Sequence, residues 1–152
     1  MAEFVARCDS AARNTLRFRE SGVGTTDASA GAVNQKAEEL KARTKRFLLD
    51  IIHFVNELPF TATAQEIGRQ LLRAGIGVAE NYRAACRSRS HREFTARIGV
   101  VLEEADEAEL WLDVLNESKL SGVAVPSALL EEGRALRRIF AASNMTARGS
   151  DS

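Results

Sequence analysis

The most informative stretch of this sequence is Phe94-Thr-Ala-Arg-Ile98-Gly-Val-Val101-Leu-Glu-Glu-Ala105-Asp-Glu-Ala108-Glu-Leu-Trp-Leu112-Asp-Val-Leu115. Its apolar residues recur at alternating intervals of four and three, which places them along one side of a helix. The preceding stretch has the same rhythm, with Ala64, Ile67, Leu71, Ala74, Val78, Asn81 and Ala85. The run from Gln70 to Glu117 therefore predicts two amphipathic helices that pack in a bundle and are joined by a short turn.

Two further helices are predicted on either side of this pair. The first spans about Asn34 to Glu57 and ends before Pro59, because the residue before a proline is disfavoured in the helical conformation. Its apolar side consists of Leu40, Thr44, Phe47, Ile51, Phe54 and Leu58. The last helix starts at Pro126-Ser127 and ends near Ala142, and its apolar side consists of Leu129, Gly133, Leu136 and Phe140.

The expected ends of the middle helices follow from capping residues. Thr61 or Thr63 can cap the second helix, and Glu66 would complete a capping box with Thr63. Ser88 or Ser90 can cap the third helix. Gly75 and Gly77 lie inside the second helix, where each costs up to about 1 kcal/mol relative to alanine. We expect close approach of another helix as the compensation.

Four helices with short connections predict an all-α protein, an up-down-up-down antiparallel four-helix bundle. The bundle is expected over residues 34–142. Residues 1–33 are expected to form a flexible N-terminal extension, since residues 21–31 are small, polar and glycine-rich. Residues 143–152 are expected to be a disordered C-terminal tail.

Composition excludes several classes of protein. The 152 residues include 21 Lys and Arg and 21 Asp and Glu, so the formal net charge is zero. No apolar run reaches the roughly 20 residues that cross a bilayer. The first thirty residues lack the apolar core of a secretory signal. Two cysteines, Cys8 and Cys86, do not form a disulfide framework, and we expect a cytoplasmic protein without membrane contact.

The turn between the second and third helices is a concentrated basic region. Arg83, Arg87, Arg89 and Arg92 lie within ten residues, together with His91, against Glu93 alone. We call these four arginines the elbow arginines. One interpretation is sequence-independent contact with nucleic-acid phosphate or with an acidic protein, sensitive to salt. The other is a solvated junction whose arginines pair with carboxylates of neighbouring helices. Tyr82 is the only tyrosine and a candidate to stack on a base.

Asn81 falls at a core position of the second helix by this spacing. A polar residue in an apolar seam can fix register or oligomeric state, so Asn81 is predicted to be a structural polar residue of the core.

The third helix carries a cluster of carboxylates that we call the acidic girdle: Glu103, Glu104, Asp106, Glu107 and Glu109. Di-iron bundles use Glu-x-x-His pairs, and the sequence contains none, so neither a metal nor a cofactor is predicted. We expect the girdle to pair with Arg69, Arg73 and the elbow arginines. The histidines are His53 and His91, and Cys86 lies in no signature of a cysteine enzyme, so no catalytic residue is predicted.

Several segments, in this order, resemble one bacterial family. They are Lys41-Ala-Arg-Thr-Lys-Arg-Phe47, Leu58-Pro59, Gln70-Leu-Leu-Arg-Ala74, Gly77-Val-Ala-Glu-Asn-Tyr-Arg83, Glu93-Phe94 and Glu103-Glu-Ala-Asp-Glu-Ala-Glu-Leu-Trp-Leu112. Together they resemble the four-helix-bundle proteins encoded in intervening sequences of 23S rRNA genes. A relative of that family is the accessory variability determinant of diversity-generating retroelements.

The resemblance implies a homopentameric ring and no enzymatic activity. It also implies, for the retroelement relatives, binding of RNA or DNA and partnership with a reverse transcriptase. Those relatives are basic, whereas this chain has no net charge. From the resemblance we expect a non-enzymatic oligomeric accessory or scaffold protein, with the elbow arginines as its nucleic-acid contact. The alternative is a protein–protein interaction module, without nucleic-acid binding, that uses the acidic girdle and the N-terminal extension.

Overall fold

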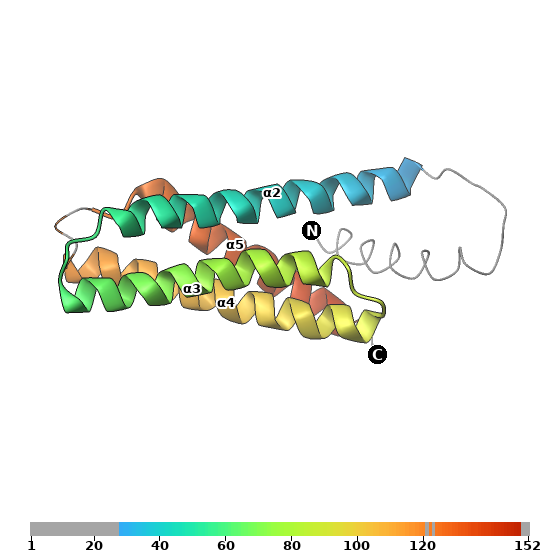
Figure 1. Ribbon diagram of the computed structural model, residues 1–152. Helices are drawn as coiled ribbons and strands as arrows, with labels where there is room; N and C mark the ends of the chain where they lie inside the picture. Colours follow the sequence, from blue (N-terminus) through green and yellow to red (C-terminus); the bar gives the residue numbers. More distant parts are fainter. Residues whose placement is uncertain (1–27, 121, 123, 150–152) are drawn as a thin grey trace.

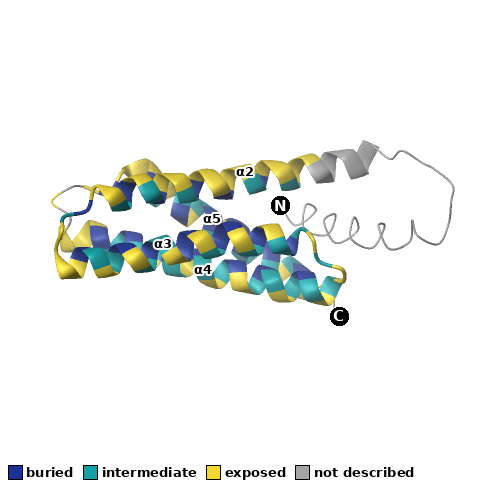
Figure 2. Cartoon of the chain, in the orientation of Figure 1, coloured by how far each residue is buried: buried dark blue, intermediate teal, exposed yellow. Residues whose placement is uncertain are grey.

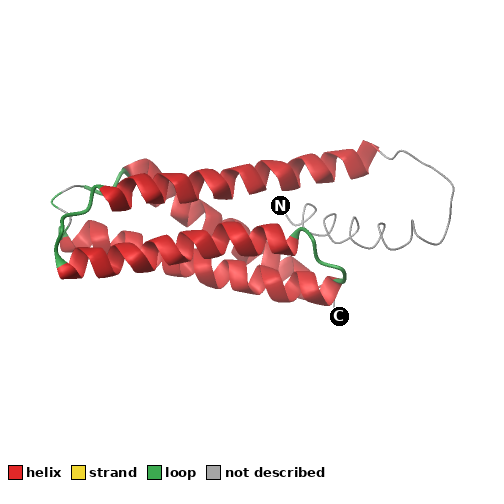
Figure 3. Ribbon diagram, in the orientation of Figure 1, coloured by secondary structure: helices red, strands yellow, loops and turns green. Residues whose placement is uncertain are grey.

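The structure is a computed structural model, and it describes residues 28–120, 122 and 124–149. Four helices make up nearly all of this part of the chain, and no strand occurs in it. They are α2 (Ala28–Asn56), α3 (Ala62–Ala85), α4 (His91–Ser118) and α5 (Ser127–Gly149). Short connections turn the chain back after each helix (Figures 1 and 3). The predicted all-α four-helix bundle is confirmed.

The helices follow one another around the bundle. α3 packs on α2 and on α4, and α4 packs on α5. The contact between α2 and α5 is the smallest of the four that exist. It includes a bidentate ion pair between Arg43 and Glu132, with nitrogen–oxygen distances of 2.6 and 2.8 Å. α2 does not contact α4, so these two helices lie at opposite corners of the bundle.

The apolar sides predicted from the sequence form the core. All seven predicted positions of α4, from Phe94 to Leu115, are buried, and so are the six predicted positions of α2, from Leu40 to Leu58. Figure 2 shows the buried residues on the sides of the helices that face one another. Burying these side chains is the main favourable term in the folding of such a bundle.

The glycines of α3 mark where its neighbours approach closely. A Cβ atom added at Gly75 would lie 2.6 Å from Cδ1 of Ile51, and one added at Gly68 would lie 2.8 Å from Cδ1 of Leu58. Ile51 lies in α2, and Leu58 lies just after the end of that helix. At Gly77 the close neighbour is instead the carboxyl group of Glu104 on α4. The expected compensation for glycine in this helix, close approach of another helix, is therefore confirmed.

Two ends of helices differ from the predictions. α2 begins at Ala28, not Asn34, since Ala28, Ala30 and Ala32 have high helix propensity and offset the glycine between them. Residues 28–33 are thus helical and not part of a flexible extension, while residues 1–27 lie outside the described part of the chain. α3 is capped by Thr61, whose side chain accepts from the Ala64 amide. Thr63 lies inside the helix, so the predicted capping box with Glu66 is wrong.

The last helix is longer than predicted. α5 continues to Gly149, so residues 143–149 are not a disordered tail. The reason is that Ser143 and Ala147 extend the buried side of the helix, with 5% and 1% exposure. The Ser143 hydroxyl donates to the carbonyl of Ile139 at 2.8 Å, which satisfies its polarity inside the core. Residues 150–152 lie outside the described residues.

Candidate nucleic-acid interface

The elbow between α3 and α4 is a short, hydrogen-bonded turn. After Ala85, the amide of Arg87 donates to the carbonyl of Ala84 at 3.0 Å, and the amide of Ser88 donates to that of Ala85 at 3.1 Å. Ser90 then caps α4, its hydroxyl accepting from the amide of Glu93 at 3.2 Å. These bonds fix the path of the chain, so the arginines of the elbow project from an ordered backbone.

The structure brings the four elbow arginines to one end of the bundle. Arg83 lies in the last turn of α3, Arg87 and Arg89 lie in the turn, and Arg92 lies in the first turn of α4. All four are exposed. No guanidinium group among them has an ion-pair partner within the described part of the chain. Within the described residues of one chain they therefore do not pair with carboxylates of neighbouring helices, although their exposure agrees with a solvated junction.

The one carboxylate between Cys86 and Arg97 is already engaged. Glu93 accepts from the amide of Arg89 at 2.9 Å and from Nε of Arg97 at 3.1 Å. The hydrogen bond from the Arg89 amide, followed by that from Arg97, lowers the pKa of Glu93. Its charge thus stabilises the start of α4 and pairs with Arg97, outside the set of elbow arginines.

The end of α5 adds a basic residue that the sequence analysis missed. The Nε2 atom of His91 lies 2.9 Å from the carbonyl oxygen of Ala147, which holds the last turn of α5 against the first turn of α4. Arg148, the next residue, is exposed. Its omission follows from ending α5 at Ala142. The spacing of Leu136, Phe140, Ser143 and Ala147, by fours and threes, was the signal that could have revealed it.

Two residues near the elbow, Tyr82 and Cys86, are buried or partly buried. Tyr82 is 3% exposed and its ring lies 5.4 Å from that of Phe140, so it is part of the core and not a stacking platform for a base. Cys86 is partly buried, and burial raises the pKa of its thiol. A raised pKa leaves fewer thiolates at neutral pH, which disfavours a nucleophilic role.

Asn81 does not lie in the core. It is partly buried, and its side-chain amide donates to the carbonyl of Gly77 in the same helix at 2.9 Å. The predicted position is wrong because a straight helix drifts by about 20° per heptad relative to a strict seven-residue repeat. Near the end of α3, that drift brings Tyr82 into the core in place of Asn81. The buried polar residues in the described part of the chain are Thr44 and Ser143.

Within one chain, the acidic girdle pairs with Arg137 of α5, which was not among its predicted partners. Arg137 forms ion pairs with Glu109 and, at 3.9 Å, with Asp106. Trp111 is partly buried against the core, and its indole nitrogen donates to Glu107 at 3.1 Å. The predicted partner Arg69 pairs with Glu66 in its own helix.

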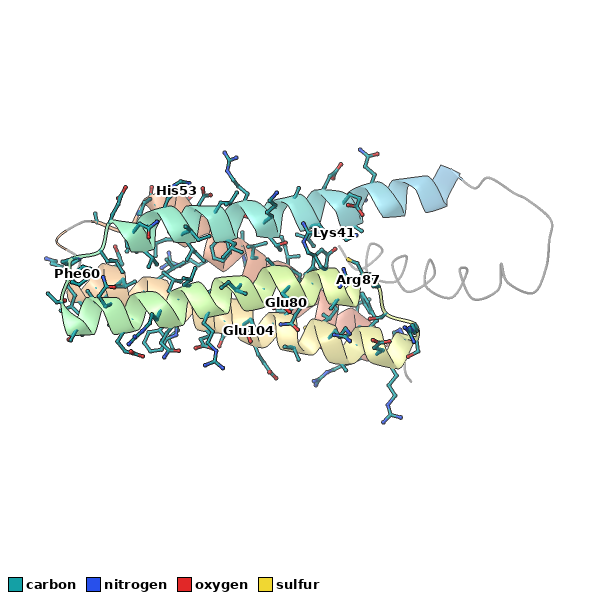
Figure 4. All side chains as sticks on the ribbon, viewed as in Figure 1. Lys41, His53, Phe60, Glu80, Arg87 and Glu104 are labelled. Atoms are coloured by element: carbon teal, nitrogen blue, oxygen red, sulfur yellow. The ribbon has the colours of Figure 1, made fainter. Side chains whose placement is uncertain are left out.

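Glu104 is the member of the girdle that faces α3. Its carboxyl group lies over Gly77, where a larger residue would collide with it (Figure 4). Burial, followed by the negative charge of Glu107, raises the pKa of Glu104, and the more distant Arg73 acts weakly in the opposite direction.

The described part of the chain contains neither a metal-ligand cluster nor a membrane-spanning helix. No group of three or more His, Cys, Asp or Glu in the described residues is arranged to hold a metal ion. His53 is exposed on the outside of α2, away from Arg87 (Figure 4). Within residues 28–120 and 124–149, no helix combines the length and apolarity needed to span a bilayer.

Comparisons with family models, with characterised proteins and with solved structures found no match to this chain.

Proposed function

We propose that this protein is a non-enzymatic accessory or scaffold protein that binds nucleic-acid phosphate through its elbow arginines. The observation that carries the proposal is that Arg83, Arg87, Arg89 and Arg92 lie together at one end of the bundle without carboxylate partners in the described structure, whereas Arg43, Arg134 and Arg137 in the body of the bundle are paired. Unpaired guanidinium groups keep their full set of donors for an external anion.

The arrangement favours contact with a phosphate backbone over recognition of bases. The charges sit at the tip of a rigid bundle, and the nearby Tyr82 is buried. Arg148 extends the same end of the molecule. Phosphate contacts of this kind position a protein on nucleic acid without reading its sequence. We therefore propose weak binding to RNA or DNA of any sequence, strengthened when several copies act together.

The partners proposed with this function come from the family resemblance. They are a second copy of the chain, in a homopentameric ring, and a reverse transcriptase. Light scattering on the purified protein measures the number of subunits. Co-purification with a reverse transcriptase encoded nearby would test the second partner.

Filter binding to generic RNA and DNA at low and moderate salt tests the elbow. The four elbow arginines are replaced by glutamine together, and the logarithm of the binding constant is plotted against that of the salt concentration. Each phosphate contact contributes about 0.9 to the slope for duplex DNA and about 0.7 for single strands. Losing four contacts therefore lowers the slope by about 3.6 or about 2.8.

The matched control replaces four basic residues away from the elbow by glutamine: Arg69, Arg73, Lys119 and Arg138. It removes the same charge and should leave most of the slope in place. If the two variants lose the same slope, net charge and not the elbow determines binding. If the wild type binds neither nucleic acid at low salt, the proposal is wrong.

The second candidate is a protein-interaction module that uses the acidic side of α4. The observation in its favour is the exposed apolar surface beside those carboxylates, where Leu110 is 54% exposed and Val100 is 38% exposed. A bundle that binds no nucleic acid but captures a basic protein through α4 would support this candidate.

A further inference from the structure

The outer side of α4 combines negative charge with exposed apolar side chains. From Ile98 to Ser118 the helix has seven carboxylates and no lysine or arginine. Val100, Glu103, Glu107 and Leu110 recur at intervals of three and four, so they form one stripe along the helix. We call these four residues the α4 face. Exposed apolar residues among charges of one sign are typical of a surface that binds a partner.

The outer side of α2 has the complementary composition. Four basic residues and no acidic residue occur between Lys41 and Arg46. Lys41 and Arg43 pair with Glu38 and Glu132. Lys45 has no ion pair in the described residues.

Arg46 has only a 3.7 Å pair with Asp50, and its side chain is 79% exposed. An exposed pair of this kind contributes little and is easily exchanged for another. Leu49, one turn further along, is 40% exposed. We call Lys45, Arg46 and Leu49 the α2 face.

One copy of the chain cannot bring these two faces together. α2 and α4 make no contact and lie at opposite corners of the bundle (Figure 1). Neither Glu103 nor Glu107 forms an ion pair within the described residues. A basic surface that is present at equal concentration is the α2 face of another copy.

We propose that the α2 face of one copy binds the α4 face of a second copy, with Lys45 and Arg46 against Glu103 and Glu107 and with Leu49 against the apolar residues of the stripe. The proposal deepens the self-association named above by assigning its two surfaces, and it does not depend on binding at the elbow. Because the two faces lie on helices at opposite corners of the bundle, two copies cannot make both contacts with each other, and the contact is heterologous: repeated copies form a closed ring or an open filament.

The assignment makes assembly sensitive to salt. The charges that meet are at the surface, and they are screened within about 8–10 Å at physiological ionic strength. The complementary charges also select the register, since a shift that placed Lys45 and Arg46 against a basic surface would be repulsive.

Sedimentation velocity and light scattering at low and high salt test the proposal on the full chain. Two variants reverse one face each: Lys45→Glu with Arg46→Glu, and Glu103→Lys with Glu107→Lys. Each is expected to weaken self-association by on the order of a hundredfold, because like charges then face each other across the contact. A variant with all four changes exchanges the two signs and should assemble again.

Mixing the two single-face variants gives a sharper test. One then has two acidic faces and the other two basic faces, so they should associate with each other although neither associates with itself. The control matched to the Lys45→Glu, Arg46→Glu variant is Lys36→Glu with Arg138→Glu, which makes the same charge change at exposed residues outside both faces. It should assemble like the wild type.

The proposal is wrong if the wild type is monomeric at low salt, or if either single-face variant assembles as the wild type does. It is also wrong if the four-change variant and the mixture fail to assemble while circular dichroism shows that every variant is folded. Filter binding on the same proteins reports the elbow separately. A monomeric protein that still binds RNA would overturn the α2–α4 contact and leave the proposed function in place.

Discussion

Replacing single glycines by alanine measures how closely α2 approaches α3. Gly75 and Gly99 both lie inside helices, so alanine gains about 1 kcal/mol of helix propensity at each. They differ in their surroundings. A Cβ atom at Gly75 would lie 2.6 Å from Cδ1 of the fully buried Ile51, whereas one at Gly99 would have its nearest neighbour, Oδ1 of Asn144, at an ordinary 3.8 Å.

The expected outcomes therefore have opposite signs. Forcing an extra carbon into a packed core typically costs about 1–3 kcal/mol, so Gly75→Ala should lower the free energy of unfolding by about 1 kcal/mol. Gly99→Ala should raise it by about 0.5–1 kcal/mol. Because the propensity gain is common to both variants, the difference between them reports the packing at Gly75.

Chemical denaturation followed by far-ultraviolet circular dichroism provides both free energies. The variants and the wild type are compared at one protein concentration, since self-association would make stability depend on concentration. Should Gly75→Ala stabilise the protein as much as Gly99→Ala does, the close contact between α2 and α3 would be refuted.

Three further predictions concern single elements of the bundle. Thr61→Ala should destabilise the protein by about 1 kcal/mol through loss of the cap of α3, while Thr63→Ala, inside the helix, should change stability by less than about 0.5 kcal/mol in the same denaturation assay. Truncation after Ala142 should lower stability by about 1–3 kcal/mol, because it removes buried Ser143 and Ala147 and the His91 contact; a truncated chain as stable as the full one would mean that the last turns of α5 contribute nothing. Glu104→Gln should stabilise the bundle at neutral pH by about 0.3 kcal/mol by removing repulsion from Glu107. Since the folded-state pKa of Glu104 is raised, the wild type loses stability as pH rises from the ordinary carboxyl pKa through the raised value, and the variant should lack this loss in denaturation series across pH.

Periodicity was sufficient to predict the bundle and the core of α4. The alternating intervals from Phe94 to Leu115 identified every buried position of α4, because burial in this helix follows the seven-residue repeat. Pro59 correctly indicated where α2 ends, because of its effect on backbone conformation. Ser90, one of the two serines proposed as caps, correctly indicated where α4 begins.

The misplaced residues show where local patterns do not suffice. Asn81 looked like a core residue because heptad counting ignores the gradual rotation of a helix, and that rotation placed Tyr82 inside instead. Ser143 looked like the start of a polar tail, although its hydroxyl is satisfied by the carbonyl of Ile139. Burial of a small polar residue depends on what packs over it, which one helix alone does not determine.

The sequence was sufficient to locate the cluster of elbow arginines but not to predict which arginines form ion pairs. The sequence shows where the elbow arginines are, since they lie within ten residues. It does not show which carboxylates reach which arginines. Arg137 comes from a distant part of the chain and engages Asp106 and Glu109, and Glu93 turns to Arg97. The pairing of Arg137 depends on the relative rotation of α4 and α5, and within the described residues no carboxylate pairs with an elbow arginine.

The separation of charge along α4 gives the molecule a permanent dipole moment. Arg92 and Arg97 lie near its first residue, and its remaining length carries only acids. If the proposed nucleic-acid contact forms, the field of the polyanion exerts a torque on such a rod as well as a force, and this torque turns the elbow arginines toward the phosphates.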